Sequence, residues 1–430
     1  MNNILLINHY AGSTRHGMEF RPFYLAREWV RAGHRVQIVA ASFSHIRARQ
    51  PEFDGAALDE QIEGIDYRWL RTPAYTGNGA GRVKNMLAFM TALWRDGPRL
   101  AREFQPDVVI ASSTYPMDIW PARRIARLSQ ARLVYEVHDL WPLSPMELGG
   151  LSRWHPFIVW VQLAEDYAYR HADKVVSMLP KAMQYMCSRG MAAQKFSYVP
   201  NGVDTEEWAQ PGDLPPPLKE TLAALRAKGL PLVGYAGTHG LSNALDVLLD
   251  AAAHLQGRAE IVMVGTGPDR DALLARVAAE GLDNVTMLPA IAKHAVPRFL
   301  DEVDIAYIGW HPNPLYRFGI SPNKLMDYMM AGKPVVHAVS AGNDPVAEAG
   351  CGLTVPPGDA AAVAEAILTL AALPAAQRQQ LGSAGKAFIL KNQTYPFLAA
   401  RFLAAATEPG ALSFIPTTPR RTSHVEDPTL

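Results

Sequence analysis

Short apolar runs alternate with amphipathic stretches along most of the chain. In the first half, the helical spacing of apolar positions is plainest at residues 19–32, 83–103 and 119–128. Apolar runs separated by such helices are typical of parallel strands that are buried on both faces. The pattern therefore predicts an α/β fold in which helices wind over parallel sheets. The predicted strands of this half are residues 4–8, 36–40, 67–70, 108–111, 133–137 and 174–177.

The same rhythm restarts after a proline-rich stretch at residues 211–217, which has the composition of a linker. A chain of 430 residues is also long for one hydrophobic core. We therefore expect two Rossmann-like, doubly wound domains at residues 1–205 and 206–390, an alanine-rich helix at 391–408 and a disordered tail at 409–430. The predicted strands of the second half are residues 232–236, 261–264, 285–288, 305–308, 335–338 and 353–355.

Composition excludes several classes of protein. Hydrophobic residues make up 49% of the chain and charged residues 19%, as in ordinary globular proteins. The formal net charge of +0 gives no electrostatic case for nucleic-acid binding. The two cysteines, Cys187 and Cys351, lie far apart, which fits a reducing cytoplasm and no zinc or disulfide scaffold. Because we find neither a signal peptide nor an apolar run of about 20 residues, we expect no membrane span.

The most informative segment is residues 318–336, which predicts a loop, a short helix and a buried strand. Ser321 suits the N-cap of this helix, and Pro322 suits its first position. The free N–H groups of a helix start attract anions, and Lys324 adds a positive charge in the first turn. Asp327 follows on the same face. A cation beside a carboxylate suits a nucleoside diphosphate, although a surface ion pair is the simpler alternative.

Loops at the ends of two first-domain strands supply further candidates, because doubly wound sheets bind ligands at that edge. The loop after residues 4–8 carries Gly17 and Glu19 before a helix starts, without the spacing of a dinucleotide fingerprint. His138 and Asp139 follow the strand at 133–137. A turn glycine and a loop histidine capped by Asp139 are the structural alternatives.

In the second domain, Thr238 and His239 follow the first strand, while Gly265 and Gly267 follow the second. Either glycine could let a base approach the backbone. The triplet at residues 269–271 has the Asp-x-Asp pattern of some metal sites. Because it opens a helix, we interpret it as N-terminal charge complementarity and expect no metal.

These motifs, together with the turn at residues 201–204, resemble the GT4-like retaining glycosyltransferases of the GT-B superfamily. That family carries two acidic residues around an FGI-type loop. Alignment on residues 331–335 places the second acid at Asp327 and the first at Gly319, where no carboxylate exists. The arginine and lysine that much of the family uses for the diphosphate fall on Thr238 and Asn243.

The resemblance implies the GT-B fold, with two Rossmann-like domains facing across a cleft and the last helix returning to the first domain. Asp327 is expected at the ribose, Lys324 at the diphosphate and His138 at the donor sugar, with His239 and Arg317 as weaker cations. The expected catalytic residues are His138, Asp139 and Lys324. The expected donor-binding residues are Gly17, Glu19, Thr238, His239, Gly265, Gly267, Ser321, Asn323, Lys324 and Asp327.

The expected reaction is metal-independent and needs no cofactor. It moves a sugar, an N-acetylated amino or deoxy sugar, from a UDP-sugar to a polyprenyl diphosphate-linked saccharide. The variant at residues 321–324 resembles the branch that builds O-antigen and capsule. Such an acceptor implies a cytoplasmic enzyme that is peripheral at the inner face of the cytoplasmic membrane. Residues 83–103 or 151–163 are the candidate contacts, because both mix apolar, aromatic and basic residues.

Three alternatives stay open. A non-hydrolysing UDP-sugar 2-epimerase shares the fold and would form an epimer without acceptor. A Rossmann oxidoreductase would bind NAD tightly, which the missing fingerprint disfavours. A non-catalytic partner that binds sugar nucleotides would explain Gly319 and would show no turnover.

Overall fold

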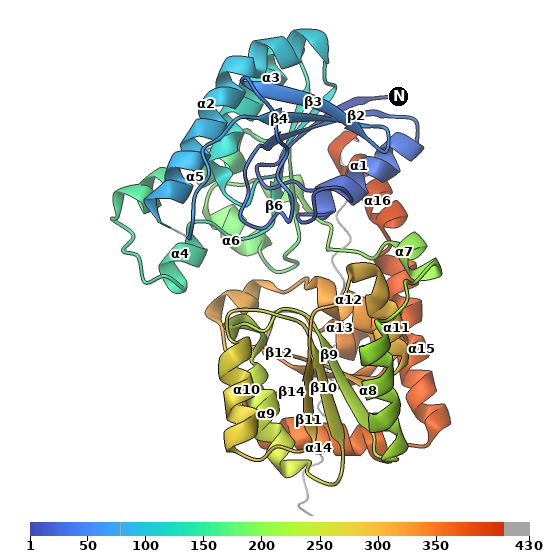
Figure 1. Ribbon diagram of the computed structural model, residues 1–430. Coiled ribbons are helices and arrows are strands. Elements are labelled where there is room, and N and C mark those ends of the chain that lie inside the picture. Colours follow the sequence, from blue (N-terminus) through green and yellow to red (C-terminus); the bar gives the residue numbers. More distant parts are fainter. Residues whose placement is uncertain (78, 408–430) are drawn as a thin grey trace, which may run out of the picture.

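A computed structural model describes residues 1–77 and 79–407 as two α/β domains stacked end to end (Figure 1). The first contains an eight-stranded sheet in the order β3-β4-β2-β1-β5-β6-β7-β8. The second contains a six-stranded sheet in the order β11-β10-β9-β12-β13-β14. The predicted fold of two wound α/β domains is confirmed. The disordered tail expected at 409–430 lies outside the described residues.

The first sheet is made of strands β1 (Asn3–Ile7), β2 (Arg35–Ala41), β3 (Ala57–Ile62), β4 (Ile65–Leu70), β5 (Val108–Ala111), β6 (Arg132–Val137), β7 (Lys174–Ser177) and β8 (Phe196–Tyr198). Its helices are α1 (Arg21–Arg31), α2 (Ala80–Glu103), η1 (Pro116–Asp118), α3 (Ile119–Ser129), α4 (Leu143–Glu147), α5 (Pro156–His171) and α6 (Met183–Ser188), and α7 (Thr205–Ala209) follows.

The second sheet is made of β9 (Leu232–Ala236), β10 (Glu260–Val264), β11 (Val285–Leu288), β12 (Ile305–Gly309), β13 (Val335–Ala338) and β14 (Gly352–Val355). Its helices are α8 (Pro216–Ala227), η3 (Leu241–Asn243), α9 (Leu245–His254), α10 (Arg270–Ala279), η4 (Lys293–Ala295), α11 (Val296–Asp301), η5 (Pro314–Phe318), α12 (Asn323–Met330), α13 (Pro345–Ala349), α14 (Ala360–Ala372) and α15 (Ala375–Asn392). The last helix is α16 (Tyr395–Thr407).

All twelve predicted strands are present, but the pattern missed β3 and β8. β3 pairs antiparallel with β4, so the first sheet is mixed and not wholly parallel. It is an edge strand in which the polar residues Asp59, Glu60 and Gln61 follow one another, and so it lacks an apolar run. β8 has only three residues. The expected linker at 211–217 is shorter than predicted, since residues 216–217 open α8 and proline is tolerated in a first helical turn.

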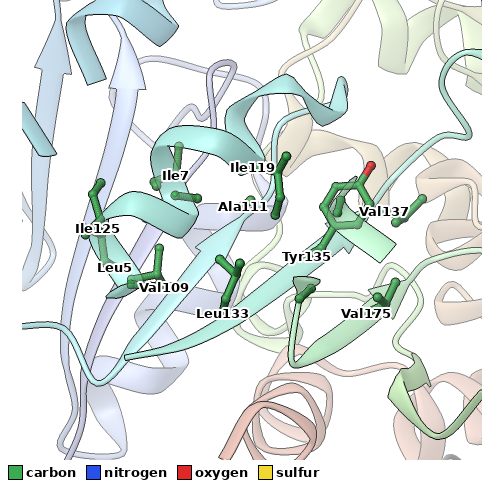
Figure 2. Packing of buried hydrophobic residues seen from close by; sticks show 14 of the residues in the cluster. Leu5, Ile7, Val109, Ala111, Ile119, Ile125, Leu133, Tyr135, Val137 and Val175 are labelled. Carbon is green, nitrogen blue, oxygen red and sulfur yellow. The ribbon is translucent and has the colours of Figure 1, made fainter. Parts of the chain in front are cut away.

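The strands are apolar because both faces of each sheet are covered. On one face of the first sheet, Leu5, Val109 and Leu133 pack in one buried cluster with Ile119 and Ile125 of α3 (Figure 2). A second cluster on the other face joins the sheet to α1 and α16. The carboxyl ends of the parallel strands then share one edge of each sheet.

α16 belongs to the first domain's core although it ends the described chain. Leu398 and Phe402 are fully buried with Trp29 of α1, whose Nε1 donates a 2.9 Å hydrogen bond to the carbonyl of Ala399. The chain passes from the first domain to the second near Val203 and returns near Gln393. These two segments lie side by side, because the Val203 N–H donates to the Gln393 carbonyl at 2.8 Å.

This packing predicts that Phe402→Ala lowers the free energy of unfolding by about 3–5 kcal/mol, the usual cost of emptying a buried phenylalanine site. Phe397 lies in the same helix but is 43% exposed, so Phe397→Ala should change it by about 0.5 kcal/mol or less. Urea unfolding of both variants measures the difference. Equal destabilisation would show that α16 is not docked as described.

Candidate active site

The two domains meet at loops that follow their sheets. The backbone N–H of Asn201 donates to Ser321 Oγ at 2.7 Å, and Asn201 Nδ2 donates to the Ser321 carbonyl at 2.8 Å. Arg317 of η5 forms an ion pair with Glu147 of α4 at 2.7 Å. The predicted site residues His138, Ser321 and Lys324 therefore belong to segments on either side of this junction.

His138 directly follows β6, and its side chain contacts Glu136 and Ser112. Its Nε2 lies 3.1 Å from Ser112 Oγ and 3.5 Å from Glu136 Oε2. Ser112 Oγ in turn donates to Glu136 Oε2 at 2.6 Å. The partner of His138 is thus Glu136 and not Asp139, which is exposed. This corrects the alternative in which Asp139 caps the histidine, and it follows from β-strand alternation, since residues 136 and 138 share a face.

Glu136 and Arg21 form a buried ion pair that the sequence reasoning missed. Both side chains are 1% exposed, and Arg21 Nε donates to Glu136 Oε1 at 2.9 Å. Arg21 Nη2 also donates to the Val199 carbonyl at 2.9 Å. Burial opposes ionisation, but the charges of Arg21 and His138 and the hydrogen bonds lower the pKa of Glu136 to about 2. A glutamate inside an apolar strand was the available signal, because a buried charge requires a partner.

The pKa of His138 is set by the same group. Burial alone lowers the pKa of an imidazole, but the Glu136 carboxylate outweighs this effect. The result is a pKa raised above the ordinary 6.5.

The glycine loop before α1 closes on itself. Gly17 has a φ of 91°, and its N–H donates to the Ser13 carbonyl at 2.8 Å. The Gly12 N–H donates to the Glu19 carbonyl, also at 2.8 Å. Glu19 Oε1 accepts from the backbone N–H of Arg21 at 3.3 Å. The N–H of Gly17, an expected donor-binding residue, is therefore already used by the tight Ser13–Gly17 turn.

α12 begins one residue later than predicted. Pro322 is its N-cap and Asn323, which is exposed, is its first residue. Ser321 is not the N-cap, because its hydroxyl accepts from the Asn201 N–H of the other domain. Leu325, Tyr328 and Met329 are buried as predicted. The N–H groups of the first turn of α12 thus have no side-chain cap.

Lys324 reaches from α12 to the end of β9. Its Nζ donates to Tyr235 Oη at 3.0 Å and to Asn243 Oδ1, and it lies against Gly237. Asn243, where the resemblance leads one to expect a lysine, is therefore the partner of a lysine. Among the described residues Lys324 has no carboxylate partner within ion-pair distance, and burial lowers its pKa to about 8. This is a cation held partly out of water without a counter-charge.

Asp327 lies one turn after Lys324 and does not pair with it in the described chain. Burial raises the pKa of Asp327 to about 6, while the charge of Lys293 and a hydrogen bond from Trp208 act in the opposite direction. Lys293 itself forms an ion pair with Glu207 at 2.7 Å and donates to Tyr24 Oη of the first domain at 2.6 Å. Asp327 is therefore held near the junction beside groups the sequence reasoning did not identify.

The loops after β9 and β10 lie directly on each other. A Cβ at Gly265 would come 1.8 Å from the Gly237 carbonyl oxygen, and one at Gly267 would come 2.1 Å from the His239 carbonyl oxygen. Both glycines are thus required by loop packing. His239 is fully buried, and neither ring nitrogen has a partner among the described residues, whereas Thr238 is exposed. Of the weaker cations, burial lowers the pKa of His239, and Arg317 is already paired.

Gly319 cannot carry the family's first acid in this backbone. Its φ is 103°, and a Cβ would lie 2.5 Å from Pro180 Cδ of the first domain and 2.9 Å from Asn343 Oδ1. Asn343 Oδ1 accepts from the Ile320 N–H at 2.7 Å, which fixes the turn. The loss of the acid is therefore accompanied by a turn that closes against the other domain.

No group of three or more histidine, cysteine, aspartate or glutamate side chains is placed to hold a metal within residues 1–77 and 79–407. Asp269 and Asp271 lie at the start of α10, as predicted from the sequence.

Comparison with known proteins identifies the family. Residues 15–207 match the model described as Glycosyltransferase Family 4, and residues 230–372 match the one described as Glycosyl transferases group 1. The chain is a glycosyltransferase of the family 4 and group 1 type. No curated protein matches its sequence.

Solved structures show that the glycosyltransferase has the GT-B fold. It is similar to sucrose-phosphate synthase from Thermosynechococcus elongatus, with a TM-score of 0.69 and 18% identity over 94% of this chain and 97% of that one. It is also similar to Anabaena HepE in complex with UDP and glucose (TM-score 0.63, 16% identity, 94% and 98% covered). WaaG, a glycosyltransferase involved in lipopolysaccharide biosynthesis, gives a TM-score of 0.64 at 12% identity over 94% of this chain and all 100% of WaaG.

The turn at Gly319 predicts that Gly319→Ala lowers the free energy of unfolding by about 2–4 kcal/mol through backbone strain and overlap with Pro180. Gly350 is the matched control, because it has a φ of 62° with no atom within 4 Å of a built Cβ. Gly350→Ala should cost only about 1–2 kcal/mol of strain. Chemical denaturation measures both, and equal costs would contradict the close approach of Gly319 to the first domain.

Proposed function

We propose that the protein transfers a sugar from a UDP-sugar to a lipid-linked saccharide with retention of configuration and without a metal ion. The observation that carries this proposal is Lys324, a partly buried cation without a carboxylate partner in the described chain, at the uncapped start of α12. A diphosphate supplies the counter-charge that this site lacks. The complexes of HepE with UDP support UDP as the nucleotide.

Each group then has one task. Lys324 and the N–H groups from Asn323 onward bind the diphosphate, and Asp327 accepts hydrogen bonds from the ribose. His138 meets the donor sugar from the first domain, beside the exposed carboxylate of Asp139. In front-face attack, a leaving phosphate oxygen takes the acceptor's proton, so the protein mainly positions the reactants and stabilises charge. No step needs a covalent carboxylate nucleophile.

The sugar and acceptor are inferred from the chain's resemblance to the O-antigen and capsule branch. We propose an N-acetylated amino or deoxy sugar and a polyprenyl diphosphate-linked saccharide. WaaG, which acts in lipopolysaccharide biosynthesis, has the same fold. Such an acceptor lies in a membrane, so the enzyme must approach the cytoplasmic membrane surface from inside the cell.

Exposed apolar side chains favour α4 and α5 as the membrane contact. Trp154 is 73% exposed, and Leu148 and Leu163 are also exposed. Arg153 stacks on Trp154, with its guanidinium carbon 4.8 Å from the ring centroid, which adds a basic group to the patch. In α2 most apolar residues of the predicted face are core, including Met86, Phe89 and Leu93.

Within the described residues, no single helix has the length and apolarity to cross a membrane. α14 and α15 pass that test only when taken together, and they are bent by 114°.

The function is tested by incubating the enzyme with a panel of UDP-sugars and a polyprenyl diphosphate saccharide in excess EDTA. We expect glycosylated lipid with a retained anomeric configuration. Lys324→Ala should lose about 2–4 kcal/mol of transition-state stabilisation in kcat/KM, because it removes the main cation at the leaving group. Lys333→Ala removes a lysine just beyond the same helix and should leave turnover unchanged.

Restoration of activity only by Mn²⁺ or Mg²⁺ would contradict the metal-free site. Binding of UDP-sugar without turnover on any acceptor would favour the non-catalytic alternative.

Membrane attachment is tested by sedimentation with anionic vesicles of phosphatidylglycerol and phosphatidylethanolamine. A Trp154→Ala, Leu163→Ala double variant should lower the partition coefficient by about tenfold, because two apolar anchors are lost. Leu241→Ala removes an exposed leucine of the second domain and should have no effect. A Trp94→Ala, Arg95→Glu variant tests α2 in the same way. Loss of binding only in this last variant would move the contact to α2, and no sedimentation of the wild type would favour an acceptor in solution.

A further inference from the structure

We propose that Glu136 is a positioning residue that holds His138 as an imidazolium, so that the first domain supplies a second positive charge to the donor. The role that we assign to this charge, binding the donor, rests on the proposed function. The structural basis of the inference is the hydrogen bonds that Ser112 makes with Glu136 and His138, which fix one ring proton, and the Glu136 carboxylate 3.5 Å from the ring.

The hydrogen bonds fix one ring proton without reference to any ligand. Ser112 Oγ has a single proton, and it lies 2.6 Å from a Glu136 carboxylate oxygen, so the hydroxyl donates there. Asn8 Nδ2 already donates to Ser112 Oγ at 3.1 Å. The hydroxyl oxygen therefore accepts from His138 Nε2 at 3.1 Å, and Nε2 carries a proton. Among the described residues, the contacts of the His138 ring are made by Nε2.

The charges around the ring favour a second proton at Nδ1. Arg21 occupies Glu136 Oε1, which leaves the other carboxylate oxygen for Ser112 and His138. Burial and the charge of Arg21 lower the pKa of His138, but the carboxylates outweigh them and raise it. The carboxyl groups close enough to His138 to interact with it are those of Glu136, Glu19, Asp118 and Asp139.

A positive charge on His138 compensates for the diphosphate-binding cations of the family that are missing from the second domain. The diphosphate residues of the family fall on Thr238 and Asn243, both uncharged, and Arg317 is paired with Glu147. Lys324 then supplies positive charge from the second domain and His138 supplies it from the first, so both domains contribute to the charge at the donor.

The direct test is the titration of His138 by NMR in the protein with labelled histidine. His138→Gln assigns the signal by its loss. We expect a pKa above 6.5, with a downward shift of about one unit or more in Glu136→Gln, since an adjacent carboxylate is neutralised. Glu165→Gln is the matched control, because Glu165 is another buried glutamate of the first domain that bonds to tyrosines, and it should leave the His138 pKa unchanged.

A wild-type pKa at or below 6.5 overturns the proposal, even if the Glu136 variant fails to fold. An unshifted pKa in a folded Glu136→Gln protein overturns it as well. Both readouts are independent of turnover, so they remain decisive if no transferase activity is found.

The pH profile of kcat/KM separates a positioning role from a structural one. As the pH rises through the His138 pKa, the imidazolium is lost and kcat/KM should fall. In Glu136→Gln this fall should begin at lower pH, displaced by the shift that NMR measures. A variant that is slower at every pH with an unmoved profile would show that Glu136 acts only on structure.

Discussion

The buried guanidinium of Arg21 is the constraint on which the site depends. It opens α1, pairs with Glu136 at the end of β6, and bonds to the backbone of residues 199–200, where the chain leaves the first domain. A buried charge that loses its partner is costly, so these three segments are held together strongly. Glu136 also contacts His138. The position of this histidine and the position of residues 199–200 therefore both depend on the ion pair between Arg21 and Glu136.

That crossing explains the turn at residues 201–204. Asn201 binds Ser321 of the second domain, and Asp204 caps α7 and pairs with Arg27 at 2.9 Å. Gly202 has no room for a side chain, since a Cβ would lie 2.7 Å from the carbonyl oxygen of Gln393, where the chain returns. Residues 201–204, which look like a plain turn in the sequence, therefore connect the two domains. They link the start of α12 to the segment that holds His138.

The sequence was sufficient for the fold because apolar runs mark the twelve strands that make up most of the two sheets. It missed β3, an edge strand in which Asp59, Glu60 and Gln61 interrupt the apolar pattern, and β8, which has only three residues. In the site, helix periodicity correctly placed Lys324 and Asp327 on α12. Strand alternation would have allowed Glu136, and not Asp139, to be identified as the support of His138. A local pattern could not show that Ser321 bonds to Asn201, which is 120 positions away, or why Gly319 is required, which depends on a backbone angle.

The central claim is that the donor lies between the start of α12 and the carboxyl end of β6. A crystal structure of the protein with UDP tests it most directly. We predict a diphosphate oxygen within hydrogen-bond distance of Lys324 Nζ, in place of Asn243, and the ribose hydroxyls at Asp327. A nucleotide bound elsewhere, with Lys324 still bonded to Asn243, would contradict the account.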